Sequence, residues 1–342
     1  MRDAFEQGPI RPPSEASSLL VRCTRNCPWN RCAFCRTYKG RKFSLRTVDE
    51  IKADLRAMRA LDWRGREPRT AFLQDADSLV MKTADLCEVL RYLREQFPTI
   101  TRATTYARAR TVAKKAPDEL ADLRAAGLDR IHIGMESGAD EVLKLISKGA
   151  SAAIHIEAGT KVKAAGMELS EYVMPGIGGR ALSDVHAAGS ARVLNAVDPD
   201  FIRLRTAAVV PGTPLHEMWR AGAFVRPADD EIVAEIRLFV AGLEGVHSRI
   251  VSAHILNLLE EVEGALPADK GRILGAIDRY LALPAADRLV FKFGRRAGYY
   301  RELDDLGDRS TRARLEDAMQ RMGVHDDDTL EAVAAELVAR YI

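Results

Sequence analysis

No run of apolar residues in this sequence approaches the ~18 residues that a membrane span needs. The first residues, MRDAFEQGPIRPPSEASS, also lack the apolar core of a secretory signal, so we expect a cytoplasmic protein with no membrane partner. A large excess of either charge is missing as well. The 51 Lys and Arg against 49 Asp and Glu leave a net charge of +2, which gives no strong electrostatic reason to expect a nucleic acid.

Cysteine is scarce, with five residues in 342, yet four of them lie together in CTRNCPWNRCAFC at positions 23–35. In a reducing compartment, clustered cysteines are more often metal ligands or catalysts than disulfides. The fifth, Cys87, lies in an apolar helical pattern and is expected to be buried. No cysteine follows it, so we expect no auxiliary iron–sulfur domain downstream.

From Leu19 to about Pro214, short apolar runs alternate with stretches of helical periodicity. The predicted strands are 18–23, 70–75, 101–108, 130–135, 168–174 and 201–210. The predicted helices are 47–60, 83–96, 117–126, 139–147, 152–166 and 182–196. Six strand–helix repeats predict parallel strands with right-handed crossovers, in a doubly wound sheet or in a complete or partial barrel.

The chain divides by pattern into a tail at 1–16, an α/β unit at 17–215 and a mainly helical region at 216–342. In barrels, chemistry collects at the C-terminal ends of the strands, and here those ends are rich in Gly, Pro, Cys and acidic residues. In the last region we predict helices at 227–263, 267–283 and 309–342, with a turn at 290–300.

The spacing Cys23-x3-Cys27-x4-Cys32-x2-Cys35 supplies four thiolates, the number that a structural zinc takes. Zinc sites of this kind usually pair two short-spaced arms, however, and the second arm is missing. A cluster held by one loop suits an iron–sulfur centre better, since three thiolates leave one iron open. Four thiols packed as hydrophobes would not be expected beside polar neighbours such as Asn26 and Asn30.

The segment NCPWNRCAFC resembles the cluster loop of the radical S-adenosylmethionine (radical SAM) enzymes, commonly Cys-x3-Cys-x-aromatic-Cys, with one residue inserted. This resemblance assigns Cys27, Cys32 and Cys35 as the cluster ligands, in the variant spacing Cys-x4-Cys-x2-Cys, and leaves Cys23 as a nearby thiol. The inserted residue leaves a second possibility, because Cys23-x3-Cys27 alone also has the family's first spacing, with Asn30 where the third cysteine would be.

Later segments are similar to the same family. The resemblance implies S-adenosylmethionine contacts from Gln74, Asp75, Ala76, Asp77, Arg108, Glu136, Gly176, Gly178, Arg203 and Arg205. The sequence QDAD stands where the family often holds the methionine amino group, Glu136 would accept from the ribose hydroxyls, and the turn MPGIGG would approach the adenosine. The aspartates in QDAD also suit a turn or a helix cap, and the basic end of the third strand also suits an exposed edge. Arg203 and Arg205 share one face of their strand, which points either into the barrel or out of it.

The resemblance implies an α/β fold, a partial (β/α)6 TIM-like barrel with a C-terminal helical extension. It also implies a [4Fe–4S] cluster and S-adenosylmethionine, which an external electron donor such as flavodoxin or ferredoxin would convert under anaerobic conditions to a 5′-deoxyadenosyl radical. That radical would abstract hydrogen from a small or medium-sized substrate. Three alternatives remain: an RNA- or tRNA-modifying radical SAM enzyme, a non-catalytic iron–sulfur or haem carrier, and a zinc protein on the same fold.

Candidate substrate residues come from the C-terminal region. His254 and Asn257 stand three residues apart in a predicted helix, so they can reach one ligand. Arg295 and Arg296, in KFGRRAGYY, can grip a carboxylate, a phosphate or a base. The same stretch also suits a tight turn that anchors the last helices to the barrel.

Overall fold

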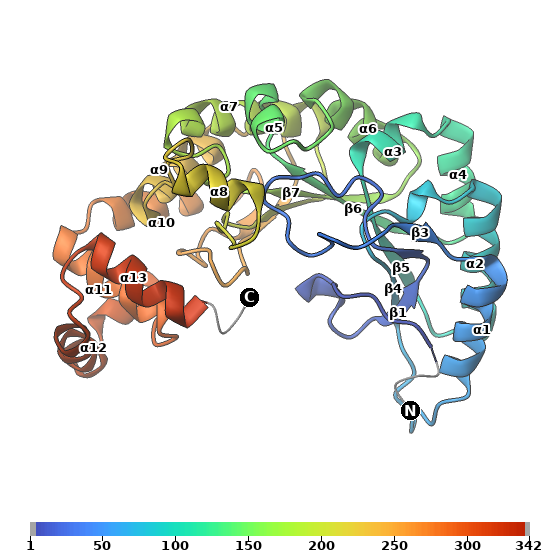
Figure 1. Cartoon of the computed structure of the whole chain (residues 1–342), viewed down its shortest axis with the longest axis horizontal. Helices are drawn as coiled ribbons and strands as arrows, with labels where there is room; N and C mark the ends of the chain where they lie inside the picture. The colour runs from blue at the N-terminus through green and yellow to red at the C-terminus, as the bar shows by residue number, and fades with distance from the viewer. Residues whose placement is uncertain (1–4, 339–342) are drawn as a thin grey trace.

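The structure is a computed structural model that describes residues 5–338. Its centre is an eight-stranded sheet in the order β1-β4-β5-β6-β7-β8-β9-β10, parallel throughout except for the antiparallel pairing of β10 with β9. The sheet curves into an open arc, as Figure 1 shows. The strands are β1 (Leu19–Arg22), β4 (Thr70–Gln74), β5 (Arg102–Ala107), β6 (Arg130–Glu136), β7 (Glu168–Val173), β8 (Phe201–Leu204), β9 (Arg249–Val251) and β10 (Gly264–Ala265).

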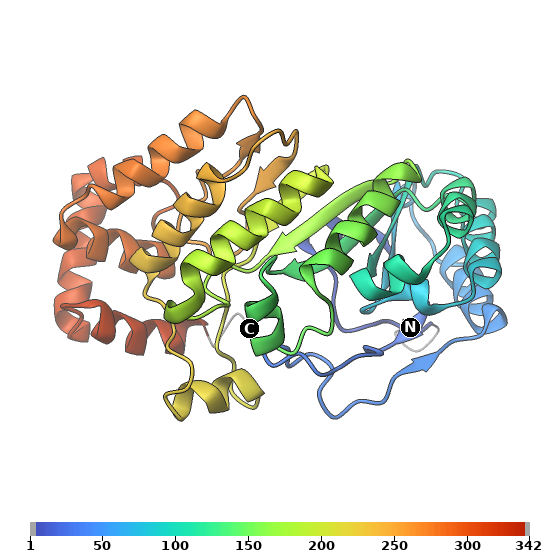
Figure 2. The same ribbon diagram turned by 90° about the horizontal axis from the view of Figure 1, so that it is seen from above.

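Helices cover the outer, convex side of this arc (Figures 1 and 2). They are α1 (Val48–Arg59), α2 (Thr83–Gln96), α3 (Ala109–Lys114), α4 (Pro117–Ala125), α5 (Asp140–Leu145), α6 (Ala152–Ala164), α7 (Ser183–Val197) and α9 (Asp229–Ala241). The predicted strand–helix alternation and the partial-barrel fold class are therefore confirmed. Among residues 5–338, no helix combines the length and the apolarity that crossing a bilayer requires.

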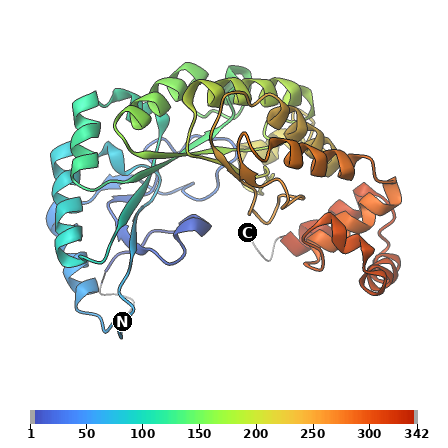
Figure 3. The ribbon, with the colours of Figure 1, turned by 180° about the vertical axis from the view of Figure 1, so that it is seen from behind.

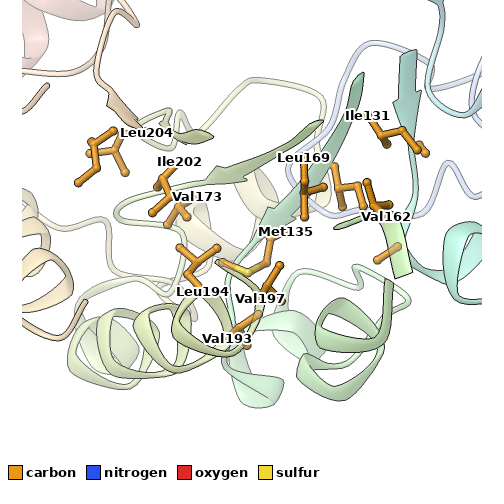
Figure 4. Close-up of a cluster of buried hydrophobic side chains, with 14 of the residues drawn as sticks. Ile131, Met135, Val162, Leu169, Val173, Val193, Leu194, Val197, Ile202 and Leu204 are labelled. Atoms are coloured by element: carbon orange, nitrogen blue, oxygen red, sulfur yellow. The ribbon is translucent and has the colours of Figure 1, made fainter. Parts of the chain in front are cut away.

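The core lies between the sheet and the outer helices. Ile131 on β6, Leu169 on β7 and Ile202 on β8 are fully buried there, and they pack with side chains of α6 and α7 (Figure 4). Because side chains alternate along a strand, the residues between them face the inside of the arc. That inner face carries aromatic and polar groups, including Tyr106 and Tyr172, whose ring centroids lie 6.2 Å apart.

The N-terminal residues are packed against the inner face rather than extended into solvent. A short 3-10 helix, η1 (Pro13–Glu15), lies on the concave side of the sheet, in dark blue in Figure 3. Glu15 is fully buried, and its carboxylate accepts from Ser18 and pairs with Arg102. Within the predicted tail, residues 5–16 therefore pack along the inner side of the partial barrel, from Gly8 beside Gln74 at the end of β4 to Glu15 beside Arg102 at the start of β5.

The C-terminal region differs from its prediction. The helix predicted at 227–263 is wrong: α9 stops at Ala241, and β9 adds a further parallel strand to β8, because glycines follow the helix and the β-branched pair Ile250 and Val251 then favours a strand. The turn predicted at 290–300 begins only after Arg296. The remaining helices are α8 (Pro214–Arg220), α10 (Lys270–Leu281), α11 (Ala285–Arg296), α12 (Arg309–Met322) and α13 (Asp327–Val338).

Two short strands, β2 (Thr24–Arg25) and β3 (Ser44–Leu45), pair antiparallel outside the main sheet. They bring the two ends of the intervening cysteine-rich loop together just after β1. The loop therefore projects from the C-terminal edge of the parallel strands, where the strand-ending turns also gather.

Candidate functional site

The cysteine loop between β2 and β3, here called the cluster loop, is fixed by backbone contacts to later parts of the chain. The N–H of Ala33 donates to the Ile146 carbonyl (2.8 Å), and the Ala33 carbonyl accepts from the N–H of Leu215 (3.0 Å). Asn30 has a φ of +46°, a left-handed conformation that asparagine tolerates, and its side-chain amide donates to the Tyr38 carbonyl (2.6 Å). The end of α5 and the start of α8 thus hold the loop in place.

The four thiols of this region are not equivalent. Cys27, Cys32 and Cys35 are partly exposed, whereas Cys23 is fully buried and burial raises the pKa of its thiol to about 12. Burial also raises the pKa of Cys32, against the opposing effect of the nearby Lys148 ammonium. Because a ligand must be a thiolate, Cys23 is the poorest candidate of the four. This geometry supports the three-cysteine assignment.

The positions of the Cys, His, Asp and Glu side chains bear on which kind of metal centre the protein can hold. Among residues 5–338, no three Cys, His, Asp or Glu side chains come close enough together to hold a single metal ion. A structural zinc needs four such ligands around one centre, and the described side chains as they stand form no such group. An iron–sulfur cluster is larger, and each thiolate binds a different iron. Three separate, partly exposed thiols on one fixed loop fit that group.

Glu136 ends β6 beside the cluster loop in an unusual conformation. Its φ is +64°, and the pairing of β6 with β7 shifts register between Gly134 and Glu136. The carboxylate forms an ion pair with Lys148 (2.8 Å), and both side chains are nearly buried. A Cβ on Gly134 would lie 2.3 Å from the Glu136 carboxylate oxygen, so any larger residue there would displace that carboxylate. The strained backbone and the cleared space aim Glu136 toward the cluster loop.

The QDAD segment ends β4, and its side chains are already engaged. Gln74 exchanges hydrogen bonds with the backbone of Gly8 (2.9 and 3.3 Å), and Asp75 accepts from Arg22 (2.7 Å) and from the Tyr38 hydroxyl (3.2 Å). Ala76 is half-buried. Asp77 is fully buried, accepts from the Thr111 hydroxyl, and has a pKa raised to about 7 by that burial. The backbone carbonyls of this segment and the second Asp77 oxygen, which is buried without a hydrogen-bond partner, remain for the predicted ammonium contact.

The end of β5 lies against the cluster loop. The Arg108 guanidinium stacks over Trp29 of that loop, 5.1 Å from the ring centroid. The Trp29 indole N–H donates to the Ser147 carbonyl (2.8 Å), and the ring closes on Gly149, where a Cβ would lie 2.5 Å from it. Arg108 therefore lies beside the cluster loop, through a tryptophan that the sequence analysis did not single out, and its contact with S-adenosylmethionine stays a prediction.

The glycine turn after β7, residues 174–179, is held by contacts with α9. Gly176 has a φ of +82°, and a Cβ on Gly178 would lie 3.0 Å from the Leu182 carbonyl. The N–H of Gly176 donates to Glu235 of α9 (2.7 Å), whose other oxygen accepts from the Ser183 hydroxyl (2.6 Å). Burial raises the pKa of Glu235 to about 7. The turn is thus fixed in a shape that side chains would obstruct.

A buried chain of polar groups links this turn to Glu136. His186 of α7 lies 3.5 Å from the Glu235 carboxylate and 2.9 Å from the hydroxyl of Ser137, the residue after Glu136. Burial lowers the pKa of His186 to about 4, so the ring is neutral at pH 7. Sequence reasoning missed Glu235 and His186 because they lie 49 or more residues from the segments they support.

Arg203 and Arg205 had two possible orientations. Their strand neighbours Ile202 and Leu204 belong to the outer core, so Arg203 lies on the inner face of the sheet, where its Nε donates to Ser170 (2.9 Å). Burial lowers the pKa of the Arg203 guanidinium. Arg205 follows the strand end and is exposed.

The C-terminal candidates belong mainly to the scaffold. His254 and Asn257 lie in a loop after β9, not on a helix, since β9 interrupts the predicted helix. Arg295 and Arg296 end α11: Arg295 donates to the Leu258 carbonyl (2.8 Å), and Arg296 forms a two-oxygen pair with Asp229 (2.9 Å each). These contacts match the anchoring alternative. His254 is half-buried, and burial lowers its pKa to about 4.

Asn257 offers a direct test of this structural role. Its amide, 1% exposed, donates to the carbonyls of Leu204 (2.9 Å) and Ser252 (3.1 Å) and accepts from the N–H of Thr206 (3.0 Å). Asn257→Ala leaves these groups unpaired, so we expect a loss of about 2–4 kcal/mol in the free energy of unfolding in urea. His254→Ala is the control and should cost less than about 1 kcal/mol. Equal effects would contradict the assignment.

A parallel partial barrel with a three-cysteine loop at the C-terminal edge of its sheet is the arrangement of an iron–sulfur enzyme. Residues 21–188 match the family model of the radical SAM superfamily, and the chain belongs to this superfamily. It is a radical SAM enzyme, and the family implies a [4Fe–4S] cluster and S-adenosylmethionine. Enzymes of this family also need a reductant.

Individual relatives are more distant. The tRNA uridine(34) acetyltransferase of Methanocaldococcus infernus is 29% identical over 120 residues, 34% of this chain and 22% of its own length. Among solved structures, coproporphyrinogen III oxidase (HemN) from Escherichia coli has 16% identity and a TM-score of 0.50, covering 70% of this chain and 54% of its own. The radical S-adenosylmethionine methyltransferase TsrM from Kitasatospora setae has 13% identity and a TM-score of 0.50, covering 92% and 66%. These structures share the fold.

Proposed function

We propose that this protein cleaves S-adenosylmethionine reductively and uses the product radical to take hydrogen from a small or medium-sized organic substrate. The observation that carries the proposal is the meeting of three partly exposed cysteines with the Glu136–Lys148 pair at one edge of the sheet. When bound, the cluster and S-adenosylmethionine supply the 5′-deoxyadenosyl radical; the protein supplies orientation and exclusion of water.

The chain's own residues take distinct parts in this proposal. Cys27, Cys32 and Cys35 hold the cluster, and Lys148 offsets negative charge gathered beside Cys32. Glu136 accepts hydrogen bonds from the ribose hydroxyls, as the family resemblance implies. We also propose that S-adenosylmethionine contacts the glycine turn, the backbone of QDAD, and the guanidinium groups of Arg108, Arg203 and Arg205.

A cavity of about 430 Å³ lies next to the cluster loop, between the exit of β8 and the C-terminal helices. Its volume is within the range of small-molecule sites, which favours a metabolite-sized substrate. An external protein such as flavodoxin or ferredoxin would deliver the electron.

RNA modification is a second candidate because of the similarity to the tRNA uridine(34) acetyltransferases. The matched segment is 22% of their length, so the similarity does not extend to the rest of those proteins. The net charge of +2 gives little electrostatic attraction to a polyanion. A filter-binding titration with tRNA separates the candidates: salt-sensitive binding at physiological ionic strength would favour RNA, and its absence would favour a metabolite.

The proposed hydrogen transfer is tested by deuterium. The reconstituted enzyme is incubated with S-adenosylmethionine, dithionite and a uniformly deuterated small-molecule extract, and 5′-deoxyadenosine is analysed by mass spectrometry. Deuterium in the product supports hydrogen abstraction from a metabolite. Unlabelled 5′-deoxyadenosine with every extract fraction, together with label transfer from deuterated RNA, would contradict it.

A further inference from the structure

The cavity next to the cluster loop brings three separate parts of the chain together. Its walls come from residues 206–211 after β8, from α8 and from α11 and α13, and Arg36, directly after Cys35, completes them. Figures 1 and 2 both place α8 between the cluster loop and the C-terminal helices. The cavity therefore joins the cluster loop to the C-terminal helices, whose role the family resemblance leaves open.

The charges that line this cavity do not cancel. Four Lys and Arg side chains face three carboxylates, which leaves one positive charge among these groups. Each carboxylate already has a cationic partner. The pairs are Arg296 with Asp229 (2.9 Å), Lys292 with Asp327, and Arg226 with Glu331 (3.5 Å).

Two guanidinium groups remain available to a ligand. Arg36 forms no ion pair within the described part of the chain and is exposed at the cavity wall. Arg226 has the longest pair of the three, and its Nε is buried without a hydrogen-bond partner. Both guanidinium groups line the cavity, so an oxyanion bound there can pair with them.

The rest of the cavity wall is apolar. Val209, Leu256 and Leu330 line it, and Trp219 of α8 keeps 48% of its surface exposed there. The Trp219 ring also lies 5.6 Å from the ring of His216, at an interplanar angle of 45°, so two aromatic rings line this side of the cavity. Such a surface gains most from covering by an apolar or aromatic ligand body.

From these contacts we propose that the cavity binds an organic monocarboxylate with an apolar body, its carboxylate held between Arg36 and Arg226 and its body against Trp219. A carboxylate carries one negative charge and matches the single excess positive charge, whereas a phosphate monoester carries about −1.5 to −2. The inference deepens the proposed function, on which it rests, by naming the substrate class of that site.

Calorimetric titration of the anaerobically reconstituted full chain tests this class. The probes are 3-phenylpropionate, its uncharged amide and 2-phenylethyl phosphate. We expect the carboxylate to bind with a dissociation constant of about 1 mM or lower and the amide at least about tenfold more weakly. Arg36→Gln and Arg226→Gln should each weaken the carboxylate about tenfold or more without affecting the amide. Arg321→Gln, on exposed α12, is the matched control and should change nothing.

Equal affinity for carboxylate and amide, tighter binding of the phosphate, or no effect of the two arginine variants would overturn the proposal. Circular dichroism and iron content of each variant separate lost binding from lost folding, and Arg36→Lys and Arg226→Lys replace any variant that fails to fold. The assay for 5′-deoxyadenosine is run on the same preparation. Carboxylate binding without 5′-deoxyadenosine would overturn the radical function alone, and 5′-deoxyadenosine without carboxylate binding would overturn this site alone.

Discussion

Replacing Cys27, Cys32 or Cys35 with Ala is expected to remove the iron–sulfur cluster and reduce 5′-deoxyadenosine formation to background. Each of these cysteines is partly exposed on the fixed cluster loop, and a cluster that loses one of three protein thiolates loses a covalent anchor. Iron per chain after anaerobic reconstitution, together with the visible absorption of the cluster, measures the effect.

Cys23→Ala is the matched control for these variants. Cys23 is fully buried, and its pKa of about 12 keeps the thiol protonated, so the variant should retain iron. Its cost should be limited to about 1 kcal/mol of stability from a small buried hole. Loss of iron in Cys23→Ala with retention in Cys27→Ala would contradict the assignment of Cys27, Cys32 and Cys35 as the ligands.

The second large effect is expected at Lys148. Lys148→Met leaves the nearly buried Glu136 carboxylate without its partner at 2.8 Å. We expect a loss of about 2–4 kcal/mol in the free energy of unfolding, somewhat less than for a fully buried pair because both side chains keep some exposure. Affinity for S-adenosylmethionine should also fall. Anaerobic urea unfolding and equilibrium dialysis with labelled S-adenosylmethionine measure the two effects.

The double variant Lys148→Met/Glu136→Gln separates stability from binding. Removing the second charge also removes the uncompensated carboxylate, so most of the stability should return while S-adenosylmethionine binding stays weak. If the double variant is no more stable than Lys148→Met alone, the pair does not behave as a buried ion pair. If it binds S-adenosylmethionine as the wild type does, the negative charge of Glu136 has no part in the cofactor site.

Much of the barrel could be predicted from sequence because its signals are local. Buried parallel strands are short apolar runs, such as TAFLQ on β4, and the cysteine spacing is a compact motif. The C-terminal region could not be predicted as well. The strand β9 has only three residues, and its register depends on the edge of β8, which no local pattern in 227–263 records.

The loops that form the candidate site could be predicted from the sequence. The residues that hold those loops in place could not. Glu136 stood out by motif, but Lys148 is its partner only because a register shift and a positive φ turn the carboxylate toward the next helix end. Gln74 and Asp75 were expected to face the cofactor, yet N-terminal residues such as Gly8 engage the Gln74 side chain. Such contacts join chain segments 66 residues apart, so no local pattern in the sequence indicates them.

Radical chemistry in this chain is tested most directly by one anaerobic assay. The reconstituted wild-type protein is mixed with S-adenosylmethionine and dithionite, and 5′-deoxyadenosine is quantified by liquid chromatography and mass spectrometry. We predict 5′-deoxyadenosine from the wild type and from Cys23→Ala, and none from Cys27→Ala. No 5′-deoxyadenosine from a preparation that binds tetrahedral zinc in place of iron would contradict a radical SAM function for this protein.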